Sequence, residues 1–211
     1  MNLLDIALDF IFPPACGICG KIGEGYICNK CYKEIRIYLY HNREMERNDI
    51  VYLLQYKDII RQKMIDYKFN DKAYLHHMFY EILIKNKKAC EFVKNYDIII
   101  PVPIYGRKKA KRGYNQSELI ARKIAKNFHI PINTKILLKT KNTPMQSSLG
   151  KNDRIKNVQN VYKVEYSEKI ENKNVLLVDD IYTTGATVTE CKRMLRLSGA
   201  RKVGVMIIAK D

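Results

Sequence analysis

The sequence of 211 residues lacks any apolar run of about 20 residues, the length that a helix needs to cross a bilayer. Its one candidate targeting segment, residues 1–12, is shorter than that, and it has neither the basic start nor the small-residue cleavage site of a signal peptide. Internal repeats and low-complexity tracts are missing too. Since 46% of the residues are hydrophobic, we expect a globular cytoplasmic protein with one domain of ordinary size and a small appendage.

Acidic residues are scarce beside basic ones: the chain has 22 Asp and Glu against 38 Lys and Arg, for a formal net charge of +16. The imbalance lies in the second half, where residues 97–211 hold 23 basic and 10 acidic side chains. A domain with this charge attracts polyanions such as a pyrophosphorylated sugar, a nucleic acid or an anionic lipid surface. The alternative is a general bias of composition towards lysine and asparagine, with solvated lysines.

Residues 1–12 carry apolar side chains at helical spacing, and Pro13 and Pro14 end the pattern. This predicts a short amphipathic helix that packs on the body of the protein or, alternatively, contacts a membrane or a partner. Two further helical patterns, at residues 58–69 and 74–85, predict a helical hood or flank.

From residue 97 onward, short β-branched runs alternate with amphipathic helical patterns, which is typical of an α/β fold with a parallel sheet flanked by helices. Gly199 ends the last of these helices. The connection over residues 140–173 is long and polar, and such connections are usually functional or mobile. Strands are predicted at residues 97–103, 132–139, 174–179 and 202–209, and helices at residues 116–128 and 186–198.

Four of the six cysteines are spaced C-x2-C-x8-C-x2-C, with Gly17 and Gly20 expected to let the backbone turn around the sulfurs. Because a cytoplasmic protein keeps its thiols reduced, two close thiolate pairs favour a tetrahedral Zn²⁺ over disulfides. Four cysteines leave no open coordination position, so we expect a structural zinc, with an added contact to nucleic acid or protein left open. Cys90 and Cys191 are expected in the core. The predicted ligands are Cys16, Cys19, Cys28 and Cys31.

The segment VLLVDDIYTTGAT at residues 175–187 is the most specific one. A fully apolar strand delivers Asp179 and Asp180 at its carboxyl end, where open α/β sheets place their ligands. The hydroxyl-rich turn that follows leads into a helix, whose first N–H groups and dipole bind phosphate. A ligand with both hydroxyls and phosphate, such as ribose 5-phosphate, fits this order of residues; the alternative is an ordinary capping turn. The predicted phosphate loop consists of Thr183, Thr184, Gly185, Ala186 and Thr187.

A second element, IIPVPIYGRKKAKRGYNQ at residues 99–116, starts with a buried strand. Its Pro-Val-Pro turn, which includes Val102 and Pro103, predicts a rigid loop. Five basic side chains follow within six positions, and they can neutralise a pyrophosphate or, alternatively, form a solvated face. This basic run consists of Arg107, Lys108, Lys109, Lys111 and Arg112.

A third element lies in the long connection and contains Gln146, Leu149, Arg154 and Asn157. We interpret it as a basic lid with Arg154 as a catalytic candidate. Closing such a lid over a sugar would exclude water and stabilise a departing pyrophosphate while C1 of the sugar gains positive charge.

Together these elements resemble one family, the ComF competence proteins, which are described as amidophosphoribosyltransferase-like. The family shows a four-cysteine zinc knot, then PVP...R....RGxNQ, then Q..L....R..N, and then the 5-phosphoribosyl-1-pyrophosphate (PRPP) motif of type I phosphoribosyltransferases. Tyr114 fills the usual aromatic position of the second motif. The resemblance covers nearly the whole chain, with the four motifs at residues 16–31, 101–116, 146–157 and 175–187.

The resemblance implies a type I phosphoribosyltransferase-like fold with a small N-terminal zinc module. Residues 1–35 would hold the helix and zinc knot, residues 36–96 the hood, and residues 97–211 the PRPP-binding domain. Asp179 and Asp180 would hold the ribose 2- and 3-hydroxyls, and the phosphate loop would hold the 5-phosphate. Val102, Pro103, Arg107, Lys108 and Arg112 would complete the PRPP site.

The family's implied role is natural transformation, in which it helps imported single-stranded DNA to cross the inner membrane, with a membrane-associated import machinery as a candidate partner. Whether this chain is an enzyme stays open. An active form would transfer phosphoribose from PRPP and Mg²⁺ to an amine or base, whereas a binding module would hold PRPP and single-stranded DNA. Residues 32–96 contain no motif for an acceptor, and Asn2 stands where a glutamine-hydrolysing nucleophile would be.

Overall fold

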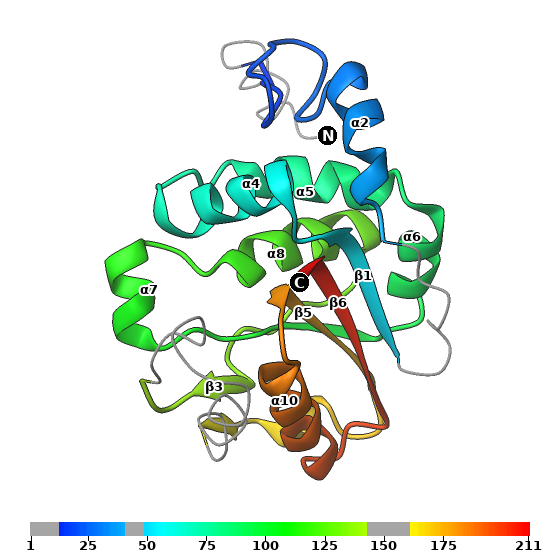
Figure 1. Cartoon of the computed structure of the whole chain (residues 1–211). Helices are drawn as coiled ribbons and strands as arrows, with labels where there is room; N and C mark the ends of the chain where they lie inside the picture. Colours follow the sequence, from blue (N-terminus) through cyan, green and yellow to red (C-terminus); the bar gives the residue numbers. More distant parts are fainter. Residues whose placement is uncertain (1–12, 41–48, 143–160) are drawn as a thin grey trace.

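The computed structural model describes residues 13–40, 49–142 and 161–211, and its centre is a four-stranded parallel sheet (Figure 1). The strand order is β1-β6-β5-β2. Val205 of β6 lies opposite Ile50 of β1 on one side and opposite Leu177 of β5 on the other, so β6 is a central strand. The strands are β1 (Ile50–Gln55), β2 (Ile98–Pro101), β5 (Asn174–Tyr182) and β6 (Lys202–Lys210).

The central strands are almost wholly apolar because both faces of the sheet are covered. Successive side chains of β5 point to opposite faces: Val175 and Leu177 join one core cluster, while Leu176 and Val178 join the other. Since the strands are parallel, their carboxyl ends meet at one edge of the sheet, and this edge positions the polar residues that follow β5.

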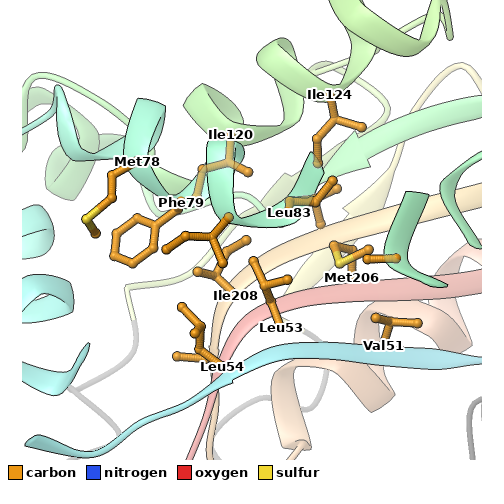
Figure 2. Close-up of a cluster of buried hydrophobic side chains, with 14 of the residues drawn as sticks. Val51, Leu53, Leu54, Met78, Phe79, Leu83, Ile120, Ile124, Met206 and Ile208 are labelled. Atoms are coloured by element: carbon orange, nitrogen blue, oxygen red, sulfur yellow. The ribbon is translucent and has the colours of Figure 1, made fainter. Parts of the chain in front are cut away.

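Helices cover the first face of the sheet. Phe79 and Ile120 come from two of these helices and pack towards Met206 and Ile208 of β6 (Figure 2). The covering elements are α4 (Asp58–Phe69), α5 (Leu75–Ile84), α6 (Lys87–Val93) and α8 (Gln116–Phe128).

The second face is covered by α10 (Ala186–Leu197) and by a small antiparallel sheet of β3 (Leu137–Lys139) and β4 (Tyr162–Val164). Val188, Cys191 and Leu195 form the buried side of α10. Figure 1 shows α10 and α8 on opposite sides of the sheet. The second half of the chain also contains two short helices, α7 (Gly106–Arg112) and the 3-10 helix η3 (Ser167–Lys169).

Most predicted elements are confirmed, and the helices at residues 58–69 and 116–128 have the predicted bounds. The predicted strand at residues 132–139 is wrong as a strand of the parallel sheet. Ile132 makes an isolated bridge to Ile99, and only residues 137–139 form a strand, which pairs with β4. The physical reason is a turn in which Asn133 Oδ1 accepts hydrogen bonds from the N–H groups of Lys135 and Ile136, at 2.8 and 3.2 Å.

β1 was not predicted, although it lies in the segment expected to form the helical hood. Its sequence, IVYLLQ, is a short apolar run, and periodicity alone does not separate a buried strand from a buried helix in such a run. The predicted helix at residues 1–12 lies outside the described residues. Among the residues that are described, no helix combines the length and the apolar character needed to cross a membrane.

Candidate functional site

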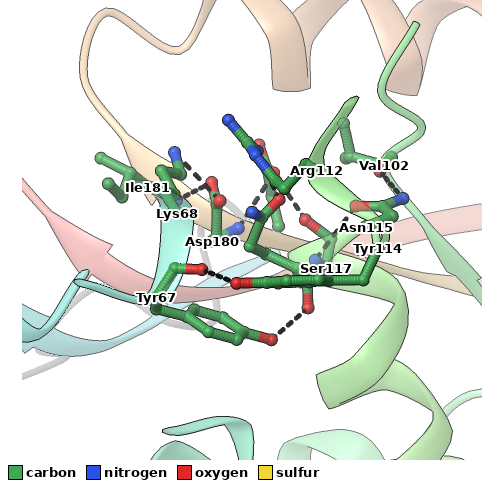
Figure 3. Close-up of polar contacts among 11 residues, drawn as sticks. Tyr67, Lys68, Val102, Arg112, Tyr114, Asn115, Ser117, Asp180 and Ile181 are labelled. Carbon is green, nitrogen blue, oxygen red and sulfur yellow. Dashed lines mark hydrogen bonds and ion pairs between the residues drawn. The ribbon is translucent and has the colours of Figure 1, made fainter. Parts of the chain in front are cut away.

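The acidic pair, Asp179 and Asp180, lies near the carboxyl end of β5 and is buried. Asp179 Oδ1 accepts hydrogen bonds from Ser117 Oγ (3.1 Å) and from the N–H of Asp180 (2.9 Å). Asp180 Oδ2 lies 2.9 Å from Nζ of Lys68, and its Oδ1 accepts from the N–H of Ile181 at 2.6 Å (Figure 3). Contacts from α4, α8 and β5 therefore fix the two carboxylates.

Burial raises the pKa of Asp179 to about 7, and the negative charge of Asp180 adds to this rise. The charge of Lys68 and the hydrogen bonds from Asp180 N–H and Ser117 act in the opposite direction without cancelling it. Near neutral pH, Asp179 is therefore divided between its protonated and its ionised form. A carboxyl group in this state can both accept a hydrogen bond from a ligand hydroxyl and donate one to it.

The phosphate loop follows β5 directly and turns into α10, as the sequence predicts. Gly185 has a φ of +78°, and a Cβ atom at this position would overlap the ring and hydroxyl of Tyr182. The N–H of Ala186 lies 3.5 Å from Thr184 Oγ1, and the three threonines of the loop are half-buried. The loop thus brings hydroxyls and N–H groups to the start of a helix, an arrangement that binds phosphate.

The Pro-Val-Pro turn is tied to the same edge of the sheet. The N–H of Val102 donates to the carbonyl of Val178 (2.9 Å), and the carbonyl of Val102 accepts from Asn115 Nδ2 (3.0 Å). Asn115 also caps α8, because its Oδ1 accepts from the N–H of Ser117 at 3.2 Å. Val102 is buried and Pro103 is half-buried. One asparagine therefore connects the turn to the helix that contacts Asp179.

The basic run forms helix α7, and its members differ in their surroundings. Lys109 Nζ lies 2.9 Å from Glu118 Oε2, so this charge is already paired. Arg112 Nη1 donates to Gln116 Oε1 (2.7 Å), and its guanidinium lies 5.2 Å from the ring centre of Phe69. These contacts hold Arg112 at the start of α8.

The other three members of the run divide by exposure. Arg107 and Lys111 are exposed, whereas Lys108 is half-buried, and burial followed by the charge of Arg112 lowers the pKa of Lys108. Burial and the charge of Lys108 also lower the pKa of Lys139, on which Asp179 acts in the opposite direction. Lys108 and Lys139 are therefore cations in the electrostatic surroundings of the acidic pair.

Three contributors to this site were not predicted: Lys68, Ser117 and Lys139. Ser117 directly follows the motif RGYNQ and could have been found from that position. Lys68 and Lys139 lie in ordinary helical and strand patterns, which carry no signal of a site. The predicted lid residues Gln146, Leu149, Arg154 and Asn157 lie outside the described residues.

Gln116 adds a polar group to this region. Its side chain is buried, and among the described residues its Nε2 atom has no hydrogen-bond partner. An unpaired buried donor destabilises the folded state. A ligand oxygen within reach of this nitrogen would therefore gain a hydrogen bond without displacing another partner.

The four predicted metal ligands come together in the four-cysteine knot (residues 16–31). Their sulfur atoms all lie within 4.8 Å of one another, and the sulfurs of Cys19 and Cys28 are 3.8 Å apart. Sulfurs on a tetrahedron around zinc, each at about 2.3 Å from the ion, would be about 3.8 Å apart. Burial raises the pKa of Cys16, but hydrogen bonds from the backbone of Cys19, Cys28 and Ile18 lower it to about 7. The cluster is consistent with zinc.

The knot and the short helix that follows it, α2 (Asn29–Ile35), pack on the helical layer. Glu81 of α5 accepts hydrogen bonds from the N–H groups of Tyr26 (2.7 Å) and Ile27 (3.2 Å). Gly20 has a φ of +79°, as expected for a turn. Gly17 serves a different purpose, because a Cβ there would lie 2.7 Å from the sulfur of Met78.

Comparison with known proteins gives two kinds of match. The family model described as "Phosphoribosyl transferase domain" matches residues 114–211. Competence protein F of Haemophilus influenzae is 28% identical over 93% of this chain and 85% of its own length. Competence protein ComFC of Bacillus subtilis is 26% identical over 87% of this chain and 72% of its own length.

A third relative matches a shorter part. The DNA utilization protein YhgH of Escherichia coli K12 is 30% identical over 54% of this chain, which corresponds to 49% of that protein. Over most of its length the chain is therefore similar to competence proteins F and ComFC, and it has a phosphoribosyltransferase-like fold with an N-terminal four-cysteine module.

Proposed function

We propose that this protein binds PRPP at the carboxyl edge of its sheet and assists the uptake of single-stranded DNA in natural transformation. One observation supports the proposal of PRPP binding. The buried acidic pair is followed closely by a loop with three threonines, which leads into α10. The family match to a phosphoribosyl transferase domain covers both features.

In this proposal each part of PRPP has its own partners. The acidic pair accepts hydrogen bonds from the ribose 2- and 3-hydroxyls, and the phosphate loop donates its N–H and hydroxyl groups to the 5-phosphate. Arg112, Lys108 and Lys139 supply positive charge for the pyrophosphate. Mg²⁺, when bound with PRPP, would neutralise part of the pyrophosphate charge, and PRPP oxygens together with the acidic pair are the groups that would hold it.

Calorimetric titration with PRPP, with and without Mg²⁺, tests the site. The double variant Asp179→Asn and Asp180→Asn should bind PRPP at least tenfold more weakly, because charge-assisted hydrogen bonds of about 1.5 to 3 kcal/mol each become neutral ones. Asp211→Asn, at an exposed position outside the site, is the matched control. A double variant that keeps its fold and binds PRPP like the wild type would exclude this site.

The DNA role is supported by the relatives, whose names refer to competence and to DNA utilization, and by the net charge of +16. In a naturally transformable host that depends on this gene, the acidic-pair double variant should lower the number of transformants. DNA should still reach a nuclease-protected state outside the inner membrane. Wild-type transformation by a variant that no longer binds PRPP would separate the two parts of the proposal.

An active phosphoribosyltransferase is the second candidate, and the pKa of Asp179 favours it. A carboxyl group with a pKa of about 7 can exchange a proton near neutral pH, which suits general acid-base catalysis. The bond from C1 to pyrophosphate would break, a bond from C1 to the acceptor nitrogen would form, and the acceptor would lose its proton. Release of pyrophosphate from PRPP, screened against amines and bases, tests this candidate.

A further inference from the structure

A groove of about 640 Å³ lies between α10 and the edge strand β1, and its lining does not include the acidic pair. β1 contributes Ile50 and Tyr52, β5 contributes Tyr182, and the remaining lining comes from α10. The groove therefore has one wall made by a helix and a floor that includes aromatic rings.

The helical wall carries three cationic side chains: Lys192, Arg193 and Arg196. Burial, followed by the charge of Arg196, lowers the pKa of Lys192, and Lys202 acts in the same direction. Two acidic groups are near: Glu190 holds the Arg193 guanidinium with two hydrogen bonds of 2.8 Å, and Asp49 pairs with Lys202 at 2.8 Å. Even with both counted, the cationic groups outnumber the acidic ones, so the wall favours an anionic ligand.

Tyr52 and Tyr182 of the floor belong to a cluster of tyrosines that also includes Tyr40 outside the lining. The ring centres of Tyr52 and Tyr182 are 5.2 Å apart, and those of Tyr52 and Tyr40 are 5.0 Å apart. Nζ of Lys210 lies 4.5 Å from the ring centre of Tyr52, and it donates a hydrogen bond to the hydroxyl of Tyr40 at 2.8 Å. All three tyrosines are half-buried, and two of them, Tyr52 and Tyr182, line the groove.

The groove is connected to the phosphate loop through one residue. Tyr182 lines the groove, and its ring and hydroxyl lie against Gly185, where a Cβ atom would overlap them. Thr189, in the first turn of α10, lines the groove as well. A ligand in the groove would therefore contact the residue that shapes the phosphate loop.

We infer that this groove is the binding site for a short stretch of single-stranded nucleic acid, with phosphates along the α10 wall and unpaired bases on the tyrosines. Single strands are favoured over duplex because stacking on tyrosine needs an exposed base face. The inference rests on the proposed DNA role but not on PRPP binding. The groove shares no residue with the basic run, in which Lys109 is already paired with Glu118.

Fluorescence anisotropy with a labelled oligothymidylate of about 12 nucleotides tests the phosphate contacts. The double variant Lys192→Gln and Arg196→Gln should bind at least tenfold more weakly, and its slope of log affinity against log salt should fall by about one to two units. The control is Lys87→Gln with Lys88→Gln, an exposed basic pair on α6, and it should bind like the wild type. The triple variant Lys108→Gln, Lys109→Gln and Lys111→Gln removes the same kind of charge from the basic run.

The stacking contact is tested with a matched pair at one position. Tyr52→Leu should weaken oligothymidylate binding about tenfold, whereas Tyr52→Phe keeps the ring and should change it by less than about threefold. Thermal unfolding of each variant separates lost binding from lost folding. The groove variants, namely the Lys192 and Arg196 double variant and Tyr52→Leu, should bind PRPP with the affinity of the wild type. Loss of oligonucleotide binding can therefore be distinguished from loss of PRPP binding.

Three results would overturn the inference. The groove variants and Tyr52→Leu could bind oligothymidylate like the wild type while the triple variant loses binding, which would place the DNA on α7. All proteins could bind duplex and single strand equally, which would exclude base stacking. The Lys192 and Arg196 substitutions could change the oligomeric state in sedimentation without changing oligonucleotide affinity, which would assign the groove to a second copy of the chain.

Discussion

The four-cysteine knot and the acidic pair are constructed in opposite ways. The knot takes all four of its clustered cysteines from residues 16–31, and the cluster forms at the outer surface of the helical layer. The acidic pair is buried and depends on Lys68, Ser117 and a strand at residues 174–182, which come from three separate parts of the chain. The residues of the local site are close in sequence, whereas those of the long-range site depend on the core that brings them together.

The largest expected effect is loss of the metal from the knot. Cys28→Ser, or a strong chelator, should remove zinc and abolish amide protection over residues 13–38, because structural zinc contributes on the order of 10 kcal/mol in comparable small modules. The sheet should keep its protection, since its strand pairing and its second core cluster include none of the four cysteines. Hydrogen exchange by mass spectrometry, together with metal analysis, measures both regions at once.

Cys90→Ser is the matched control for this experiment, because Cys90 lies on α6 and outside the cluster. It should keep one zinc per chain. Equal loss of protection in the sheet and in the knot would contradict the proposed independence of the two regions.

The next effect concerns Asp179 and pH. Its pKa rises from 3.8 to about 7 on folding, so the folded state holds this proton more tightly than the unfolded state does. The resulting stabilisation is complete below about pH 4 and is lost as the pH rises through about 7. Asp179→Asn removes this titration, so the variant should gain up to about 4 kcal/mol over the wild type between pH 4 and pH 8. Urea unfolding at several pH values measures the difference.

Ser117→Ala serves as a control for that result, because it removes one hydrogen bond to Asp179 without removing the carboxyl group. The stability of this variant should still fall as the pH rises. A wild-type protein whose unfolding free energy is flat across this range would show that Asp179 is ionised throughout.

Lys68→Met should have an intermediate effect. It leaves Asp180 without its cation in a site where the two side chains are 22% and 11% exposed, which should cost about 1 to 3 kcal/mol at neutral pH. Because the variant loses one positive charge beside the acidic pair, its binding of PRPP should also depend more strongly on Mg²⁺. Lys57→Met, on an exposed residue at the start of α4, is the control. Identical Mg²⁺ dependence in wild type and variant would contradict this role.

The smallest effect is expected for Tyr67→Phe. The buried hydroxyl of Tyr67 donates to the carbonyl of Gln116 at 2.8 Å, linking α4 to α8 beside the acidic pair. Losing this bond should lower the free energy of unfolding by about 1 kcal/mol and leave the zinc content unchanged. Tyr74→Phe, at an exposed position, should cost nothing measurable in the same urea titration.

The same contrast explains what could be predicted from the sequence. The cysteine ligands are close in sequence, so spacing alone predicted their cluster, and the apolar strand before Asp179 and Asp180 predicted where those residues lie. Lys68 could not be predicted, because only the packing of α4 against α8 brings it to Asp180. β1 was missed because a six-residue apolar run has no distinctive period, and its place beside β6 is decided by long-range pairing.

The central position of β6 has a consequence for how the protein folds during synthesis. Residues 202–210 pair with β5 on one side and β1 on the other, so neither neighbour has a complete set of partners until these residues have left the ribosome. The four cysteines of the knot are synthesised well before that moment. A nascent chain stalled before residue 202 would therefore expose two apolar strand edges, the kind of surface that chaperones bind and that aggregates.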